Sequence, residues 1–166
     1  MYGDTSDIET ADNDVRYVQT GNMNFCGLAH ETRYNWVLEQ CDLANKIILD
    51  FGCGSGYGAY MLAKRAQLVL GVDYSQRAIN YAIRRYQLKN LKFINIDACS
   101  KDVVHLLGEH SFDFVISFDV IEHIERYFDY IENILSLMVE FCLSLNSSLC
   151  YTLILPVLSS SFHTFV

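Results

Sequence analysis

The residues best suited to chemistry lie between positions 47 and 56, where the chain reads IILDFGCGSG. The apolar run predicts a buried strand that delivers Asp50 to its carboxyl end. Gly52, Gly54 and Gly56 then follow at every second position. Glycines there let the backbone turn sharply and approach a ligand where a Cβ atom would clash. This stretch therefore indicates a site for a nucleotide-like cofactor.

The glycine spacing alone does not identify that cofactor, because Gly54, Gly56 and Ala59 also fit the Gly-x-Gly-x-x-Ala pattern of dinucleotide sites. Asp50 distinguishes the two cofactor classes. A carboxylate beside the helix terminus that must hold a pyrophosphate repels it, whereas it attracts the amino group and sulfonium of S-adenosylmethionine. The sequence favours S-adenosylmethionine, and an NAD-dependent oxidoreductase is the weaker alternative.

Further carboxylates stand at the predicted ends of later strands. Asp73 follows the run LVLGV, where it can accept hydrogen bonds from both hydroxyls of a ribose. Asp97 follows FINI, where it can accept from an adenine amino group, although an aspartate there is also typical of a turn or helix cap. Together with Asp50 and Asp119, these acids predict a site that attracts a cationic cofactor.

The elements that must position these residues alternate along the chain. Strands are predicted at 46–50, 68–72, 91–96, 112–118 and about 149–155, and helices at 29–41, 57–66, 75–88, 101–107 and 123–140. This alternation predicts parallel pairing with right-handed crossovers. We expect an α/β fold with a Rossmann-like, doubly wound, mostly parallel sheet in three α/β/α layers. Ligands bind at the carboxyl ends of the strands in such sheets.

Composition narrows the classes of partner. The 166 residues suffice for one domain, and the formal charge of −8 without a basic run argues against nucleic acid and favours a small-molecule substrate. The six cysteines show no Cys-x-x-Cys spacing, and no secretory signal is visible. These features predict reduced thiols in a cytoplasmic protein, with no metal site.

The segments ILDFGCGSG, GVDYS, NID and FDFVISFDVIEHI carry a family resemblance. From about His30 to Ile124 the chain resembles the class I S-adenosylmethionine-dependent methyltransferases. Within that class it is similar to the ubiquinone-biosynthesis O-methyltransferases and to small bacterial enzymes that act on sugars or natural products. The resemblance implies methyl transfer to an oxygen or nitrogen of a small molecule or sugar.

The resemblance also implies roles for individual residues. Asp73 would hold the ribose, Asp97 the adenine amino group, and Arg33 the methionine carboxylate. Arg33 is equally typical of a surface helix. The methionine moiety would contact Gly52 and its neighbours, and the remaining members of the predicted cofactor site are Asp50, Cys53, Gly54, Gly56, Tyr74 and Val120.

The Glu122-His123 pair is the candidate for acid–base chemistry. Methyl transfer to a hydroxyl needs alignment and removal of a proton, for which a histidine is suited. We therefore predict that His123 is a catalytic base. The alternative is that both residues begin the helix 123–140 and cap its free backbone amides.

The two ends of the chain differ in composition from its middle, and the carboxyl end departs from the family pattern. Residues 1–20 carry acids at positions 4, 7, 9, 12 and 14 before any basic residue, which is typical of a disordered tail, and we assign the domain to 21–166. Residues 141–166 carry no Asp, Glu, Lys or Arg, and the family's last helix and strands have no counterpart.

The apolar run near the carboxyl end is too short to span a membrane and contains Pro156. It predicts a strand at an open sheet edge, through which the chain would self-associate. A C-terminally incomplete domain is thus expected, and the alternative function is cofactor binding without turnover.

Overall fold

A computed structural model describes residues 25–138 and 152–156. Its sheet has the order β3-β2-β1-β4-β5, and the strands are β1 (Ile47–Phe51), β2 (Leu68–Asp73), β3 (Leu91–Asn95), β4 (Phe114–Phe118) and β5 (Thr152–Pro156). Strands β1 to β4 are parallel. Because β1 lies at the centre with helices on both faces, four of its five residues are buried, which explains its continuous apolar run.

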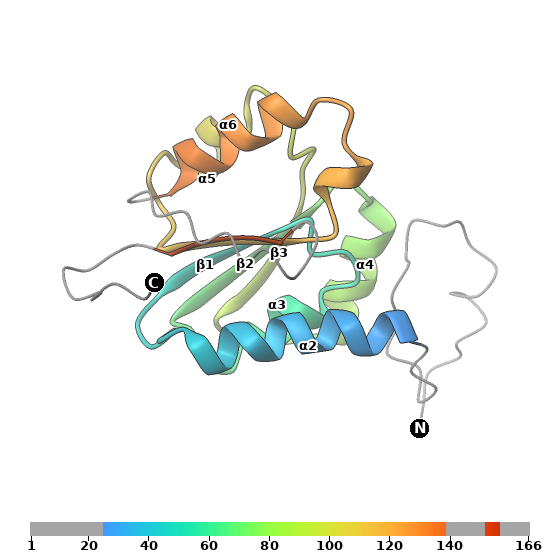
Figure 1. Ribbon diagram of the computed structural model, residues 1–166, viewed down its shortest axis with the longest axis vertical. Coiled ribbons are helices and arrows are strands. Elements are labelled where there is room, and N and C mark those ends of the chain that lie inside the picture. Colours follow the sequence, from blue (N-terminus) through green and yellow to red (C-terminus); the bar gives the residue numbers. More distant parts are fainter. Residues whose placement is uncertain (1–24, 139–151, 157–166) are drawn as a thin grey trace, which may run out of the picture.

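The helices cover both faces of this sheet (Figure 1). Three of them lie on one face, α2 (Phe25–Gln40), α3 (Tyr57–Ala63) and α4 (Gln76–Arg85), while α5 (Val103–Leu107) and α6 (Tyr127–Leu137) lie on the other. Two separate apolar cores result. Tyr34, Val37 and Leu62 belong to the first, and Val103 and Ile134 belong to the second. The predicted three-layer α/β/α fold is confirmed.

Helix α4 forms as its sequence predicts. The Oγ of Ser75 accepts a hydrogen bond from the backbone N–H of Ala78 at 3.3 Å, which caps the first turn. Ala78, Ile79 and Ala82 are buried on the face that packs against the sheet. The amino end of α4 is therefore set by a local feature, and the helix supports β2 and β3 next to the glycine loop.

The start of α6 differs from the prediction. We expected a helix from residue 123, but residues Ile121–His123 form a separate 3₁₀ turn and α6 begins at Tyr127. Ile124, between them, has an extended backbone. The alternative in which His123 begins and caps this helix is therefore wrong, because the chain first turns across the carboxyl end of β4 before α6 starts.

The last strand also differs from the alternating pattern. Strand β5 pairs antiparallel with β4, so that Thr152 lies opposite Phe118 and Pro156 opposite Phe114. A bridge between Phe112 and Met138 places the end of α6 at the amino end of β4. Strand β5 therefore starts at the carboxyl end of β4 and runs in the opposite direction. A single helical crossover would instead have made β5 parallel to β4.

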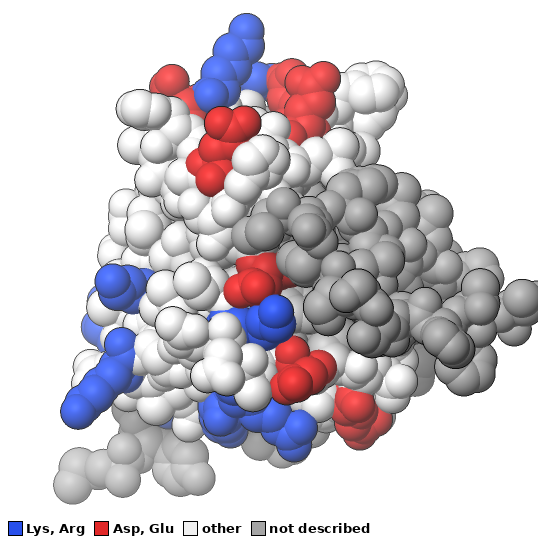
Figure 2. All heavy atoms as spheres, turned by 90° about the vertical axis from the view of Figure 1, so that its left-hand side faces the viewer, with Lys and Arg blue, Asp and Glu red and all other residues white. Residues whose placement is uncertain are grey.

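Several predictions fall outside the described residues. These are the acidic tail of 1–20, its boundary at 20/21, and most of the uncharged region 141–166. Within the described ranges, no helix is long and apolar enough to cross a membrane. Figure 2 shows acidic and basic side chains interspersed on the face that it presents, without a continuous basic stripe.

Candidate functional site

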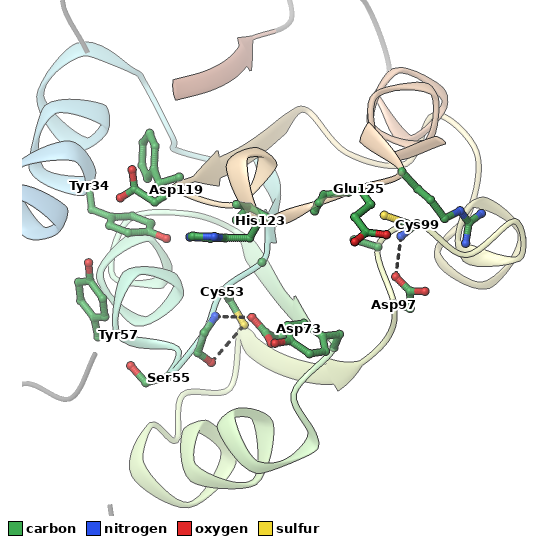
Figure 3. Close-up of a pocket in the computed structure, with 18 residues that line it drawn as sticks. Tyr34, Cys53, Ser55, Tyr57, Asp73, Asp97, Cys99, Asp119, His123 and Glu125 are labelled. Carbon is green, nitrogen blue, oxygen red and sulfur yellow. Dashed lines mark hydrogen bonds between the residues drawn. The ribbon is translucent and has the colours of Figure 1, made fainter. Parts of the chain in front are cut away.

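A cavity of about 500 Å³ opens at the carboxyl ends of the parallel strands, where the fold class predicts a ligand site (Figure 3). Its walls come from Tyr34 of α2, the loop after β1, the end of β2, the loop after β3, the stretch 118–120 at the end of β4 and the stretch 123–126. Eight predicted site residues line it: Gly52, Cys53, Gly54, Asp73, Tyr74, Asp97, Val120 and His123. Arg33, Asp50 and Gly56 stand behind this wall and do not line it.

The three glycines of the loop meet different surroundings. All three have positive φ, of 92° at Gly52, 52° at Gly54 and 82° at Gly56, a region that favours glycine. A Cβ atom at Gly52 would overlap the side chain of Val120, and one at Gly56 would lie 2.6 Å from Ala82. At Gly54 a Cβ would meet no atom of the described residues within 4 Å. Gly52 and Gly56 are thus required by protein packing, and Gly54 presents open backbone to the cavity.

Asp73 holds this loop in place. Its Oδ2 accepts from the backbone N–H of Gly54 at 2.8 Å, and its Oδ1 accepts from that of Ser75 at 2.9 Å. The same carboxylate lines the cavity, where it can accept hydrogen bonds from ligand hydroxyls. Asp73 therefore both fixes the glycine loop and presents acceptors to the cavity.

Asp50 is buried below the loop and has 1% of its surface exposed. The hydroxyl of Tyr34 donates to its two oxygens at 3.0 and 3.2 Å, and the backbone N–H of Ala59 in the first turn of α3 also donates to it. Burial raises the pKa of Asp50 to about 7, the Tyr34 hydrogen bond opposes this rise, and the charge of Asp73 adds to it. The carboxylate occupies the amino end of α3, which a pyrophosphate would otherwise use.

One end of the cavity is aromatic. The ring of Tyr34 meets those of Tyr57 and Phe118 edge to face, with centroids 5.5 and 4.9 Å apart. Asp119 lies beside Tyr34, and its Oδ2 accepts from Nη1 of Arg33 at 2.7 Å. Arg33 does not line the cavity, and its contact with the site is the ion pair with Asp119.

The other end is formed by the loop after β3. Asp97 Oδ1 accepts from the backbone N–H of Cys99 at 2.9 Å, and burial raises the pKa of the Cys99 thiol. From α6, Nδ2 of Asn133 donates to the carbonyls of Ala98 and Ser100 at 2.9 and 3.0 Å. These bonds fix the loop that presents Asp97.

His123 lies between the two ends, across the cavity from Cys53 (Figure 3). It is solvent-exposed and comes from the 3₁₀ turn after β4. An imidazole with access to both cavity and solvent can accept a proton from a ligand and release it to water.

The charge of the lining is predominantly acidic. Four carboxylates face the cavity, and the basic residues among the described lining are Arg126 and His123; the acids are Asp73, Asp97, Asp119 and Glu125. No described group of His, Cys, Asp and Glu side chains is arranged to hold a metal ion. The cavity therefore suits a ligand with hydroxyl donors and positive charge.

Sequence reasoning did not assign Tyr34 to the site, and it placed Asp119 there only as one of the acids at the strand ends, without a role of its own. Tyr34 shares a helical face with apolar residues, which indicated only a core contact. Asp119 follows a strand as Asp73 and Asp97 do, and this position was its detectable signal.

Comparison with known proteins gives a consistent result. The family model described as "Methyltransferase domain" matches residues 42–153. A probable S-adenosylmethionine-dependent methyltransferase of Mycolicibacterium smegmatis is 32% identical over 113 residues, covering 63% of this chain and 41% of that protein. A ubiquinone biosynthesis O-methyltransferase of Coxiella burnetii is 30% identical over 105 residues, covering 63% of this chain and 44% of that protein. The chain thus spans less than half the length of these two curated relatives.

Solved structures share the fold. Magnesium protoporphyrin IX methyltransferase of Synechocystis, solved with bound S-adenosylhomocysteine, superposes with a TM-score of 0.58 at 25% identity, covering 72% of this chain and 58% of that chain. The [4+2]-cyclase SpnF superposes with a TM-score of 0.60 at 22% identity, covering 74% of this chain and 45% of that chain. The likeness to SpnF concerns the fold alone.

Proposed function

Because the chain belongs to the methyltransferase-domain family, we propose that it binds S-adenosylmethionine and transfers the methyl group to an oxygen or nitrogen of a small molecule or sugar. The acid-rich lining of the cavity is the observation that supports this most directly, with four carboxylates against one arginine and one histidine. Such a lining attracts a sulfonium and an ammonium group and repels phosphates.

The residues present fit this cofactor. Gly54 offers open backbone, Asp73 offers acceptors for the ribose hydroxyls, and Asp97 offers one for the adenine amino group. Asp50 occupies the amino end of α3, which disfavours a dinucleotide. When bound, S-adenosylmethionine supplies an electrophilic methyl group on a sulfonium.

The protein's contribution to the reaction is alignment and proton removal. His123 lines the cavity from the side opposite the glycine loop and is exposed enough to exchange protons with solvent. We assign it the role of general base toward a hydroxyl acceptor. Glu125, two residues later, also lines the cavity and adds to its negative charge.

Calorimetric titration with S-adenosylhomocysteine and with NAD tests the cofactor assignment. We expect S-adenosylhomocysteine to bind and NAD to show no heat of binding, since a pyrophosphate finds no free helix terminus. Binding of NAD without binding of S-adenosylhomocysteine would contradict the proposal.

Cofactor binding without turnover is the second candidate function. The matches cover 41% and 44% of the two relatives' lengths, so more than half of each relative lies outside the matched region. A methyl-release assay over a panel of hydroxyl and amine acceptors distinguishes the two candidates. Turnover of any acceptor above the rate in buffer establishes the enzyme, and binding of S-adenosylhomocysteine with no turnover favours the binding domain.

Two further assignments complete the proposal. We place the protein in the cytoplasm, supported by the free thiols of Cys41, Cys53 and Cys99. We also propose that it self-associates through β5, which ends the described sheet and carries no charge. Light scattering should show a mass above one chain that falls when Ile154 is replaced by lysine. A monomer at all concentrations would contradict this assignment.

A further inference from the structure

Strands β1 and β4 separate at their carboxyl ends. The pairing of β1 with β2 continues to Phe51 opposite Val72, whereas the pairing of β1 with β4 ends at Asp50 opposite Ile116. The strand order reverses between β1 and β4, and ligands bind at such a switch point. The glycine loop and the β4 loop, defined as residues 119–123, therefore line the cavity from the two sides of this gap.

Tyr130 of α6 spans the gap. Its side chain is fully buried, and its ring stacks on that of Phe51 with centroids 5.1 Å apart. The phenol donates to the backbone carbonyl of Phe51 at 3.2 Å. A phenol has one hydrogen, so the hydroxyl of Ser117 must donate to the phenol oxygen, 2.5 Å away. One side chain of α6 is thus bonded to the ends of both central strands.

A second contact acts in the opposite sense. Val120 packs so closely on Gly52 that a Cβ atom at this glycine would overlap its side chain. This contact limits how near the β4 loop can come to the glycine loop, and the bonds of Tyr130 limit how far the two strand ends can part. Because protein interiors are close-packed, the two limits together fix the width of the gap.

Bonds on the other side of the glycine loop show which wall would shift without the phenol. The backbone N–H groups of Gly52 and Cys53 donate to the carbonyl of Val72 at 2.8 and 2.9 Å. The glycine loop is therefore held by β2 independently of Tyr130. Loss of the phenol would shift the β4 loop, which carries His123, against a glycine loop that stays in place.

We propose that Tyr130 is a positioning residue of the cofactor site, which sets the gap between the glycine loop and the β4 loop through its bonds to Phe51 and Ser117. This inference rests on the proposed function and on the contact of the methionine part with Gly52 and its neighbours that the family resemblance implies. Gly52 and Val120 both line the cavity, so a ligand group at this point contacts both sides of the gap.

The nucleoside part of the cofactor, assigned to Asp73 and Asp97, lies on the β2 and β3 side of the gap and does not cross it. Two ligands therefore separate the effects. S-adenosylhomocysteine carries the amino-acid part, whereas 5′-methylthioadenosine ends at the methyl group on its sulfur. A change in the width of the gap should act on the first ligand and spare the second.

Tyr130→Phe is the variant that tests the bridge, because it removes the hydroxyl and keeps the ring that stacks on Phe51. Calorimetry of the full chain measures both affinities. The affinity for S-adenosylhomocysteine should fall about 3- to 30-fold, the range over which packed and hydrogen-bonded networks transmit a change. The affinity for 5′-methylthioadenosine should stay within about twofold.

Ser117→Ala removes the other hydroxyl of the bridge and should cause the same selective loss. Combined with Tyr130→Phe, it should add less than its effect alone, because both substitutions break one network. Ile134→Val is the matched control, since Ile134 lies one turn later on α6, is 1% exposed and makes no side-chain hydrogen bond. It should lower stability in urea and leave both affinities unchanged.

Unchanged affinity for S-adenosylhomocysteine in a folded Tyr130→Phe variant would overturn the inference and leave the proposed function intact, and so would equal losses for the two ligands. Equal losses in Tyr130→Phe and Ile134→Val would also overturn it, because the effect would then follow stability alone. A wild-type chain that binds neither ligand would refute the proposed function and this inference with it.

Discussion

Asp73 illustrates how one side chain serves the fold and the site together. Its two oxygens accept from the backbone at Gly54 and Ser75, and the same carboxylate lines the cavity. Sequence reasoning gave it only the ligand role. The bonds to the loop mean that its removal acts on cofactor affinity by two routes.

Asp73→Ala should weaken binding of S-adenosylhomocysteine by about 10-fold or more, since each hydrogen bond to a charged group contributes about 1.5–3 kcal/mol. Asp73→Asn is the matched variant. Its amide oxygen can still accept the hydrogen bond from Gly54, so this variant should lose less cofactor affinity than Asp73→Ala. Calorimetry measures both, with circular dichroism as the check on folding. An unchanged dissociation constant in a folded Ala variant would exclude Asp73 from the site.

His123→Ala should slow turnover of a hydroxyl acceptor by roughly 10²–10⁴, as loss of a general base does. The dissociation constant of S-adenosylhomocysteine should change little, because the imidazole acts on the acceptor. Methyl release under saturating cofactor measures the rate. His105→Ala is the control, since His105 lies on α5 and does not line the cavity. Equal rates in His123→Ala and wild type would leave His123 without a catalytic role.

At the scale of elements, the glycine loop joins α3 to its neighbours through close packing. A Cβ at Gly56 would meet Ala82 of α4 at 2.6 Å and Phe93 of β3 at 2.7 Å. Gly52 makes the equivalent approach to Val120 after β4. The glycines of this loop are therefore needed for the close packing of strands and helices, as well as for the approach of a ligand.

Gly56→Ala should destabilise the fold by several kcal/mol, combining a strained backbone with an overpacked contact. Gly54→Ala, whose Cβ meets none of the described residues within 4 Å, should cost about 1–2 kcal/mol from the backbone alone and should weaken cofactor binding. Urea unfolding of the two variants gives the comparison. Equal stabilities would show that the contact with α4 relaxes without cost.

The sequence predicted those features that depend on local pattern. Apolar runs and turn residues located β1 to β4, and the alignment of parallel strands brought Asp73 and Asp97 to one cavity. The pairs Tyr34–Asp50 and Arg33–Asp119 were not predictable, because their members lie 16 and 86 residues apart and meet only when α2 packs at one rotation. The antiparallel β5 was missed because its direction depends on the path between α6 and the sheet.

At the scale of the whole molecule, Asp50 couples stability to pH. Its pKa rises from 3.8 to about 7 in the folded chain, so between these values the folded state binds more protons than the unfolded state. The free energy of unfolding therefore falls as pH rises through this window, and the loss is complete above pH 7.

Asp50→Asn should remove this contribution. Between pH 5 and pH 8 the loss of stability in wild type should exceed that in the variant by about 2.7 kcal/mol, because the folded pKa lies two units above pH 5 and each unit is 1.36 kcal/mol. Urea unfolding at both pH values measures it. The same pH dependence in both proteins would show that other groups carry the effect.

The bonds from Asn133 to the loop after β3 have a consequence for synthesis. The loop that presents Asp97 is held by a residue of α6, 33 and 35 positions later in the chain. The glycine loop, Asp73 and Asp97 therefore leave the ribosome well before Asn133, whose side-chain amide holds the loop after β3 in place. While α6 is still inside the exit tunnel, the nascent chain has no finished pocket, and the cofactor cannot assist its folding until that helix has emerged.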